Sequence, residues 1–150
     1  GEFEIGSVFI TGVQTNGHKK GESELRNTMY MFDFNGINVL HLGDLNRIPT
    51  QTEVEDLGPI NVALVPVGGG GALNAIKATE IISLLEPNIV IPMHYAIPAT
   101  GATAQKMDSL DKFMKEMGLS KIETVPSLKI PNVAALPEET KVVILEYQKS

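Results

Sequence analysis

The alternation of hydrophobic and polar positions predicts a mixed α/β fold. Short apolar runs rich in β-branched and aromatic residues recur between turn residues, which is typical of strands. We expect strands at residues 7–13, 28–34, 37–42, 61–66, 88–92 and 141–147. Apolar residues at helical spacing predict helices over residues 74–86 and 108–117. Residues 47–58 contain Pro49 and indicate a loop with a short helical turn, whose acidic side chains we expect in solvent.

Two local units follow from this pattern. Asn35-Gly36 lies between the second and third predicted strands and is typical of a type I′ hairpin turn. The strand 61–66, a run of four glycines, a helix and the strand 88–92 form a βαβ unit, with Asn74 as the helix N-cap. Its two strands should be parallel, with a right-handed crossover. Both strands therefore end at one edge of the sheet, where ligand sites of open α/β sheets collect.

Composition limits the classes of function. The chain has 150 residues, 43% of them hydrophobic, which fits one domain over residues 1–150 with its own core. A net charge of −6 with scattered basic residues argues against a nucleic-acid partner. No apolar stretch reaches the roughly 20 residues that cross a bilayer, and no secretion signal is visible, so we expect a cytoplasmic protein without membrane contact. The absence of cysteine excludes disulfides and thiolate metal sites.

The first residues, Gly1-Glu2-Phe3, lack a methionine and lie almost at once in a strand-like run. We expect the chain to be part of a longer one. Half of a layered fold would expose apolar sheet surface. For such a fragment we predict self-association into a homo-oligomer.

Three apolar runs end in residues that suit a metal site. Asp44 follows one run, the glycines 68–71 follow the next, and His94 follows the third. Carboxylate oxygen and imidazole nitrogen are ligands for divalent Zn, Mn, Fe or Ni. His18, in the loop 14–26, is a further candidate ligand, whereas His41 lies within a strand and is expected to support the site by packing. The alternative is that Asp44 and His94 bond each other or nearby backbone.

The glycine run also invites a nucleotide-binding interpretation, which its spacing does not favour. A P-loop needs Gly-Lys followed by Ser or Thr, but Gly71 precedes Ala72. A dinucleotide fingerprint needs a glycine where Leu73 stands. What remains is a loop whose backbone can approach a ligand or another loop closely.

Several motifs together carry a resemblance to a known family. They are Asn27-Thr28, Asn35-Gly36, His41-Leu42-Gly43-Asp44-Leu45, Gly58-Pro59-Ile60-Asn61-Val62, Val65-Pro66-Val67-Gly68-Gly69, Glu86-Pro87 and Val90-Ile91-Pro92-Met93-His94-Tyr95. In this order and spacing they resemble the metallo-β-lactamase superfamily, in particular its prokaryotic metal-dependent hydrolases related to ascorbate-6-phosphate lactonase. The resemblance implies an αβ/βα sandwich, of which this chain would be an incomplete, C-terminal portion.

The resemblance also implies site roles. Asp44 corresponds to the carboxylate that bridges two metals, His94 to a ligand of the second metal, and His18 is the one candidate for a further ligand histidine. The superfamily's principal His-x-His-x-Asp-His cluster has no counterpart in this chain.

Two functional hypotheses follow. The first is a hydrolase with a divalent metal, zinc before Mn, Fe or Ni. Its metal-bound hydroxide, oriented by Asp44 as the catalytic residue, attacks an ester, lactone or phosphoester in a small-molecule substrate. This chain alone is then inactive. The second is a non-catalytic binding or assembly module on a degraded hydrolase fold, which predicts little bound metal. No substrate-binding residue can be named from the sequence.

Overall fold

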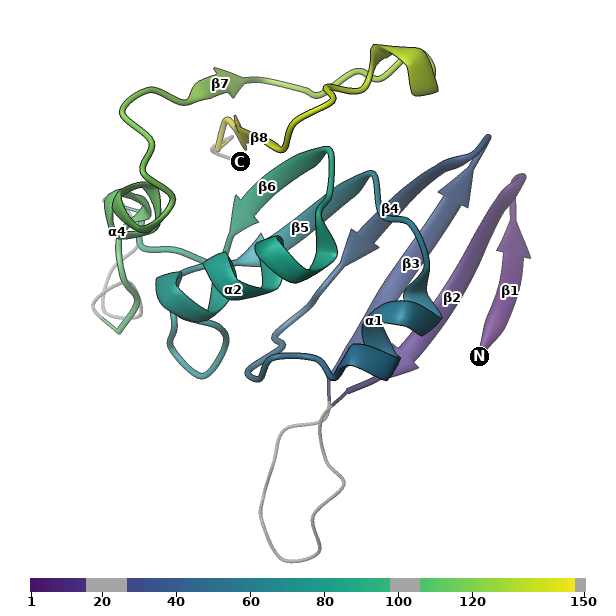
Figure 1. The fold of residues 1–150 in the computed structure, drawn as a ribbon, viewed down its shortest axis with the longest axis horizontal. Coiled ribbons are helices and arrows are strands. Elements are labelled where there is room, and N and C mark those ends of the chain that lie inside the picture. The colour runs from purple at the N-terminus through teal and green to yellow at the C-terminus, as the bar shows by residue number, and fades with distance from the viewer. Residues whose placement is uncertain (16–26, 98–105, 148–150) are drawn as a thin grey trace, which may run out of the picture.

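A computed structural model of the chain describes residues 1–15, 27–97 and 106–147, and it contains one mixed sheet with helices on one face (Figure 1). The strand order is β1-β2-β3-β4-β5-β6-β8-β7. The strands are β1 (Glu2–Ile5), β2 (Val8–Gln14), β3 (Thr28–Phe34), β4 (Ile37–His41), β5 (Val62–Pro66), β6 (Ile89–Met93), β7 (Glu123–Val125) and β8 (Lys141–Leu145). The helices are α1 (Gln51–Leu57), α2 (Ala75–Leu85), α4 (Leu110–Glu116) and the 3₁₀ turn η1 (Val133–Ala135). Within these described ranges, no helix has the length and apolar character needed to cross a membrane.

The first four strands form an antiparallel meander. Between β3 and β4, Asn35 and Gly36 both adopt left-handed backbone angles, with φ of 51° and 79°. These are the angles that a type I′ turn requires, so the predicted hairpin is confirmed.

The other half of the sheet is parallel. β4, β5, β6 and β8 run in the same direction, and α2 crosses between β5 and β6. The Asn74 side chain accepts a hydrogen bond from the Lys77 N–H at 3.0 Å, as expected of the predicted N-cap. The βαβ unit is therefore confirmed, and the carboxyl ends of β4, β5 and β6 lie along one edge of the sheet, which we call the carboxyl rim.

The main core lies between the sheet and its helices (Figure 1). The buried side chains of α2 are Ala75, Ala78, Ile81, Ile82 and Leu85. The second predicted helix is present but shorter, as α4, and its fully buried side chain is Phe113. Leu110 and Met117, apolar residues of the predicted helical pattern, are partly buried and pack against the core beside it.

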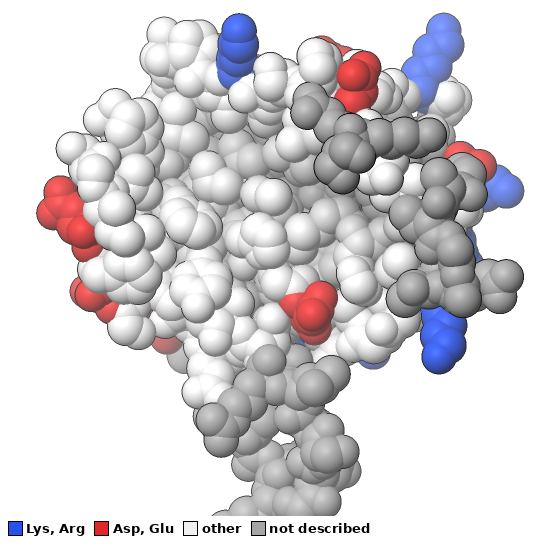
Figure 2. All heavy atoms as spheres, turned by 180° about the vertical axis from the view of Figure 1, so that it is seen from behind, with Lys and Arg blue, Asp and Glu red and all other residues white. Residues whose placement is uncertain are grey.

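The opposite surface of the sheet is apolar and much more exposed. Because cross-strand neighbours point to the same side, the register places one apolar set on this surface. The set, called the open face below, is Phe3, Ile5, Ile10, Phe32, Phe34, Val39, Val62, Leu64, Ile89 and Ile91. Figure 2 shows this side with few charged atoms. Phe3, Ile5 and Phe34 keep about half or more of their surface exposed, whereas Val62 and Ile89 are covered with the help of Leu128 and Leu136.

A ladder of three asparagines closes the edge opposite the carboxyl rim. Asn61 Oδ1 accepts from the Asn38 N–H at 2.8 Å, and Asn61 Nδ2 donates to Asn88 Oδ1 at 3.1 Å. Asn88 Nδ2 in turn donates to the Pro137 carbonyl at 2.9 Å. These bonds satisfy polar groups where the parallel strands begin.

Candidate functional site

Asp44 lies at the tip of a tight turn that follows β4. Leu42 and Leu45 are fully buried on either side of it, and Gly43 adopts a left-handed φ of 63°. The Leu45 N–H donates to the Leu42 carbonyl at 3.3 Å and closes the turn. With both leucines anchored in the core, the Asp44 carboxylate is held outward at the carboxyl rim.

Two polar side chains support this turn from below. Asn27 Oδ1 accepts from the Asp44 N–H at 2.9 Å, and Asn27 Nδ2 donates to the Leu42 carbonyl at 3.0 Å. A Cβ atom on Gly43 would lie 2.5 Å from Asn27 Oδ1, so the close approach requires glycine there. His41 Nδ1 accepts from the Gly43 N–H at 3.0 Å, which gives His41 the supporting position expected from its place within a strand.

His94 follows the last residue of β6 and has an uncommon backbone conformation. Its φ of +54° lies in the left-handed region, which non-glycine residues adopt rarely. A Cβ atom on Gly68 would clash with the His94 carbonyl oxygen and lie 2.8 Å from the Tyr95 Cα. A Cβ atom on Gly70 would lie 3.9 Å from His94 Nε2, an ordinary contact distance, so the close approach depends on Gly68. The glycine run therefore lets the His94 turn approach closely, which confirms the predicted close-approach loop.

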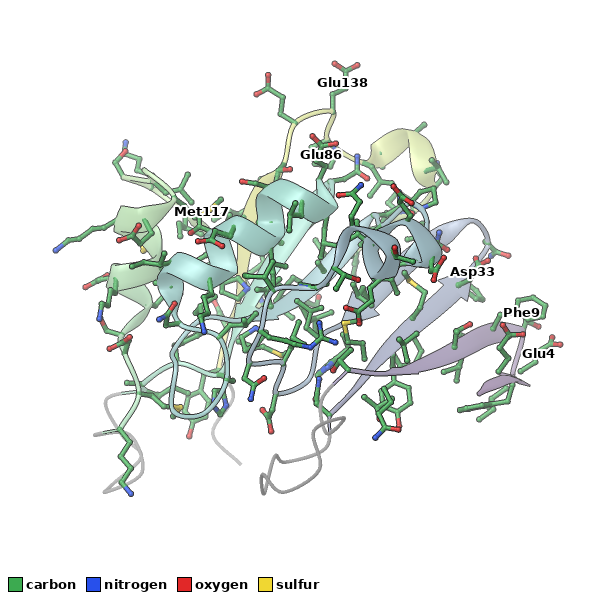
Figure 3. The ribbon with its side chains drawn as sticks, turned by 60° about the horizontal axis from the view of Figure 1, so that its bottom comes forward. Glu4, Phe9, Asp33, Glu86, Met117 and Glu138 are labelled. Atoms are coloured by element: carbon green, nitrogen blue, oxygen red, sulfur yellow. The ribbon has the colours of Figure 1, made fainter. Side chains whose placement is uncertain are left out.

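Backbone hydrogen bonds join the three strand exits. The Leu73 N–H, after the glycine run, donates to the Leu45 carbonyl at 2.9 Å, and the Val67 N–H donates to the Met93 carbonyl at 3.0 Å. Adjacent strands lie about 4.8 Å apart, so β4 and β6, on either side of β5, are separated by about 10 Å. Figure 3 turns this rim forward, with Glu86 and Glu138 at the opposite edge.

The rim supplies an incomplete donor set for a metal. Asp44 and His94 are exposed there and offer carboxylate oxygen and imidazole nitrogen, which suit zinc and similar divalent ions. In the part of the chain that the structure describes, no three His, Cys, Asp or Glu side chains form a group able to hold a metal ion. The candidate ligand His18 lies outside the described residues. Since a catalytic zinc site uses three protein ligands, Asp44 and His94 fit as part of such a site.

One further residue at the rim, Asp108, was not singled out by the sequence. The Asp108 N–H donates to the Gly68 carbonyl at 2.8 Å, and its carboxylate pairs with Lys112 at 3.2 Å. Its place at the start of the predicted helix 108–117 was the available signal. Beside His94, burial raises the pKa of the Tyr95 phenol, so the hydroxyl stays protonated at neutral pH.

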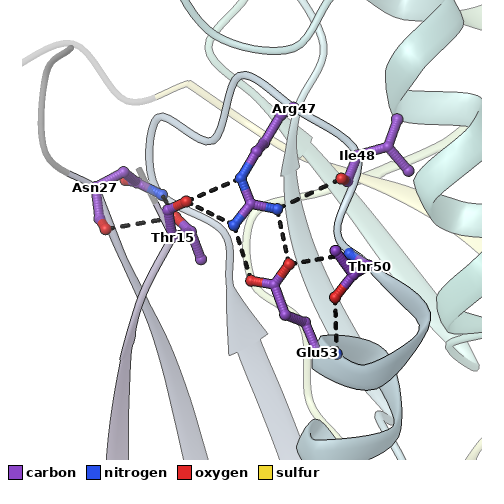
Figure 4. Close-up of polar contacts among 6 residues, drawn as sticks. All are labelled: Thr15, Asn27, Arg47, Ile48, Thr50 and Glu53. Atoms are coloured by element: carbon purple, nitrogen blue, oxygen red, sulfur yellow. Dashed lines mark hydrogen bonds and ion pairs between the residues drawn. The ribbon is translucent and has the colours of Figure 1, made fainter. Parts of the chain in front are cut away.

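An ion pair connects α1 to the base of the rim. Arg47 donates to both carboxylate oxygens of Glu53 at 2.8 Å and to the Thr15 carbonyl at 2.9 and 2.6 Å (Figure 4). Mainly because of the hydrogen bond from Arg47, the pKa of Glu53 falls from its ordinary 4.5 to about 2. The expectation that this carboxylate is a solvated surface group was therefore wrong, since it pairs with Arg47 and caps α1 through the Thr50 N–H.

Comparison with known proteins identifies the family. The β-lactamase superfamily domain matches residues 1–94. Metal-dependent hydrolases of the UPF0173 group from Thermococcus onnurineus and Pyrococcus horikoshii are 31% and 33% identical over 98 residues, which is 63% of this chain and 44% of each relative. The chain thus spans less than half the length of these relatives.

Solved structures agree with this assignment. A Thermotoga maritima protein, described as a candidate Zn-dependent hydrolase of the metallo-β-lactamase superfamily, superposes with a TM-score of 0.82 at 34% identity. The match covers 99% of this chain and 70% of that protein. A metallo hydrolase from Ignicoccus hospitalis, 20% identical, shares the fold with a TM-score of 0.60 over 97% of this chain and 55% of its own. By domain, sequence and fold, the chain belongs to the metallo-β-lactamase superfamily.

Proposed function

We propose that the complete protein is a metal-dependent hydrolase and that Asp44 and His94 supply part of its metal site. The observation that carries the proposal is the carboxyl rim, where the Asp44 turn, the glycine run and the His94 turn are hydrogen-bonded side by side. Relatives that are about a third identical to this chain over the 98 matched residues are named metal-dependent hydrolases, which supports the same conclusion.

The residues of this chain have distinct tasks in the proposal. Asp44 offers a carboxylate on a rigid turn, and His94 offers an exposed imidazole on a backbone turn that packs against Gly68. When bound, a divalent metal supplies Lewis acidity and lowers the pKa of a water molecule towards neutrality. Zinc is the proposed ion, because the donor types suit it and the Thermotoga maritima protein is described as Zn-dependent. The proposed substrates are small molecules with an ester, lactone or phosphoester bond.

Residues 1–150 alone carry at most three of the candidate ligands, which are Asp44, His94 and His18. We therefore propose that these residues are inactive by themselves. Within residues 1–15, 27–97 and 106–147 no three His, Cys, Asp or Glu side chains form a group able to hold a metal ion, which favours a second candidate function, a binding or assembly module on a hydrolase fold that has lost its metal.

Metal content and hydrolysis of the complete protein separate the two functions. The test substitution is Asp44→Asn, and the control is Asp33→Asn. Asp33 sits by the β3–β4 turn, at the edge opposite the carboxyl rim, and its Oδ1 accepts from the Gly36 N–H, a bond that an asparagine can keep. If the protein is a hydrolase, the wild type and the Asp33→Asn control contain metal and cleave a nitrophenyl ester, a lactone or a phosphodiester. The Asp44→Asn variant then loses both the metal and the cleavage. A wild type without metal supports the second function, and unchanged metal and activity in Asp44→Asn overturn the assignment of Asp44.

A further inference from the structure

Asn27 uses its whole side-chain amide to hold the Asp44 turn. Its Oδ1 accepts from the Asp44 N–H at 2.9 Å, and its Nδ2 donates to the Leu42 carbonyl at 3.0 Å. The two bonds bracket Gly43, so they fix the backbone on both sides of the one residue in the turn with a left-handed φ. The orientation of the Asp44 backbone therefore depends on a side chain 17 positions earlier in the sequence.

The asparagine is itself fixed from the other side. Its Nδ2 also donates to Thr15 Oγ1 at 3.0 Å, and its own carbonyl accepts from the Thr15 N–H at 2.9 Å. Thr15 is 1% exposed and Asn27 is 8% exposed, so water does not compete freely for these bonds. A buried, fully bonded amide of this kind has one stable orientation.

Neither alanine nor aspartate reproduces this set of bonds. Alanine would leave the Asp44 N–H and the Leu42 carbonyl without their partner, and aspartate could not donate to Leu42 or Thr15. Gly43 makes the contact possible, since a Cβ there would lie 2.5 Å from Asn27 Oδ1. The contact that orients the Asp44 backbone therefore depends on both Gly43 and Asn27.

We propose that Asn27 is the positioning residue of the Asp44 ligand, setting the backbone of the turn so that the carboxylate is presented in one orientation at the carboxyl rim. This inference rests on the proposed metal site. Groups that orient a metal ligand through a hydrogen bond typically change metal affinity about 10- to 100-fold when removed. Asn27 acts through the Asp44 backbone and touches neither metal nor substrate in this role.

The test compares Asn27→Ala with Asn61→Ala in the complete protein. Asn61 is a matched control, because it also accepts from a backbone N–H, that of Asn38, and donates from its amide, but it lies at the opposite edge of the sheet. Two quantities are measured. One is the zinc dissociation constant, by competition with a chelator. The other is hydrogen exchange of the Asp44 amide in metal-free protein, which does not depend on activity.

We expect Asn27→Ala to raise the zinc dissociation constant about 10- to 100-fold and to speed exchange of the Asp44 amide at least about 10-fold. Asn61→Ala should leave both within about threefold of the wild type, because distant, independent sites do not couple. Should Asn27→Ala fail to fold, Asn27→Ser replaces it. Serine keeps a hydroxyl near Thr15 but is too short to reach both Leu42 and Asp44, so the same losses are expected.

The outcomes separate this inference from the proposed function. A wild type that binds no zinc overturns both. A wild type that binds zinc, together with an Asn27→Ala variant of unchanged affinity and exchange, overturns only the positioning role. Equal losses in Asn27→Ala and Asn61→Ala also overturn it, because they would show a general loss of stability.

Discussion

Replacing Glu53 by glutamine should destabilise the fold in a pH-dependent way. The carboxylate accepts two hydrogen bonds from Arg47 and one from the Thr50 N–H. These contacts lower its pKa from 4.5 to about 2. At about 1.4 kcal/mol for each unit of pKa difference, the lowered pKa of Glu53 corresponds to about 3 kcal/mol of stability when the carboxylate is charged. The Glu53 side chain is 24% exposed and the Arg47 side chain 37%. Solvent screening therefore reduces the expected loss of unfolding free energy in Glu53→Gln to about 1–2 kcal/mol at pH 7.

The sign of the pH dependence follows from the lowered pKa. The folded state holds its charged carboxylate more strongly than the unfolded state does, so the stabilisation is complete above about pH 5. It is lost as the pH falls from 4.5 towards 2, where both states become protonated. Glutamine keeps the shape and one acceptor oxygen but has no charge. The difference between wild type and Glu53→Gln should therefore shrink as the pH is lowered.

Urea unfolding at pH 7, 5, 4 and 3 measures this difference. Glu55→Gln is the control, because Glu55 lies on the same helix and its carboxylate bonds the neutral Gln51 amide at 3.1 Å. It should lose less than about 0.5 kcal/mol at every pH, as exposed surface substitutions usually do. Equal losses in the two variants at pH 7, or a loss in Glu53→Gln that is the same at pH 3 as at pH 7, would refute the reasoning.

Three other predictions concern the fold. Asn74→Ala should lower the free energy of unfolding by about 1 kcal/mol, measured by thermal or urea unfolding. Ser109→Ala at the N-cap of α4 should lower it clearly less, because the Ser109 side chain makes no cap bond. Equal losses in the two variants would contradict this prediction. Gly68→Ala should cost about 1–3 kcal/mol or more because its Cβ meets backbone, whereas Gly12→Ala has its nearest contacts at 3.4 Å and should be tolerated. Residues 1–150 expressed alone should self-associate through the open face, and Phe34→Lys should weaken this; light scattering that shows a monomer would contradict the prediction.

The parts of the fold that follow from local pattern were predictable from the sequence. The Asn35-Gly36 hairpin and the βαβ unit with its Asn74 cap depend on neighbouring residues, and both are present. α1 was expected as a loop with a short turn, although Thr50 and Glu53 have the spacing of a capping box, a signal that could have identified the helix. The short strand β7 could not be predicted, because three residues become a strand only by pairing with β8.

The candidate site was predictable only in outline. Parallel strands must end at one edge, so the edge shared by the glycine run and His94 could be inferred from the crossover helix, whereas the parallel pairing that brings Asp44 to the same edge is seen in the structure. The supporting contacts could not be inferred. The bond from Asn27 to the Asp44 turn joins distant positions, and nothing in the spacing of the glycines shows that they make room for the turn at His94. Such contacts depend on how loops pack, which no local periodicity encodes.

The change from antiparallel to parallel pairing at β4 has a consequence for the order of folding. β3 and β4 are joined by a two-residue turn, so the entropy cost of closing the loop between them is small. An isolated hairpin of this kind forms in about 1–10 μs. The chain between β4 and β5 contains α1 and its flanking loops, and the chain between β5 and β6 contains the whole of α2. Pairings of this longer range are slower to form. We therefore expect the β3–β4 hairpin to act as the early template, with β5 and β6 pairing later to form the carboxyl rim and β8, which has the longest connection to its neighbour β6, pairing last.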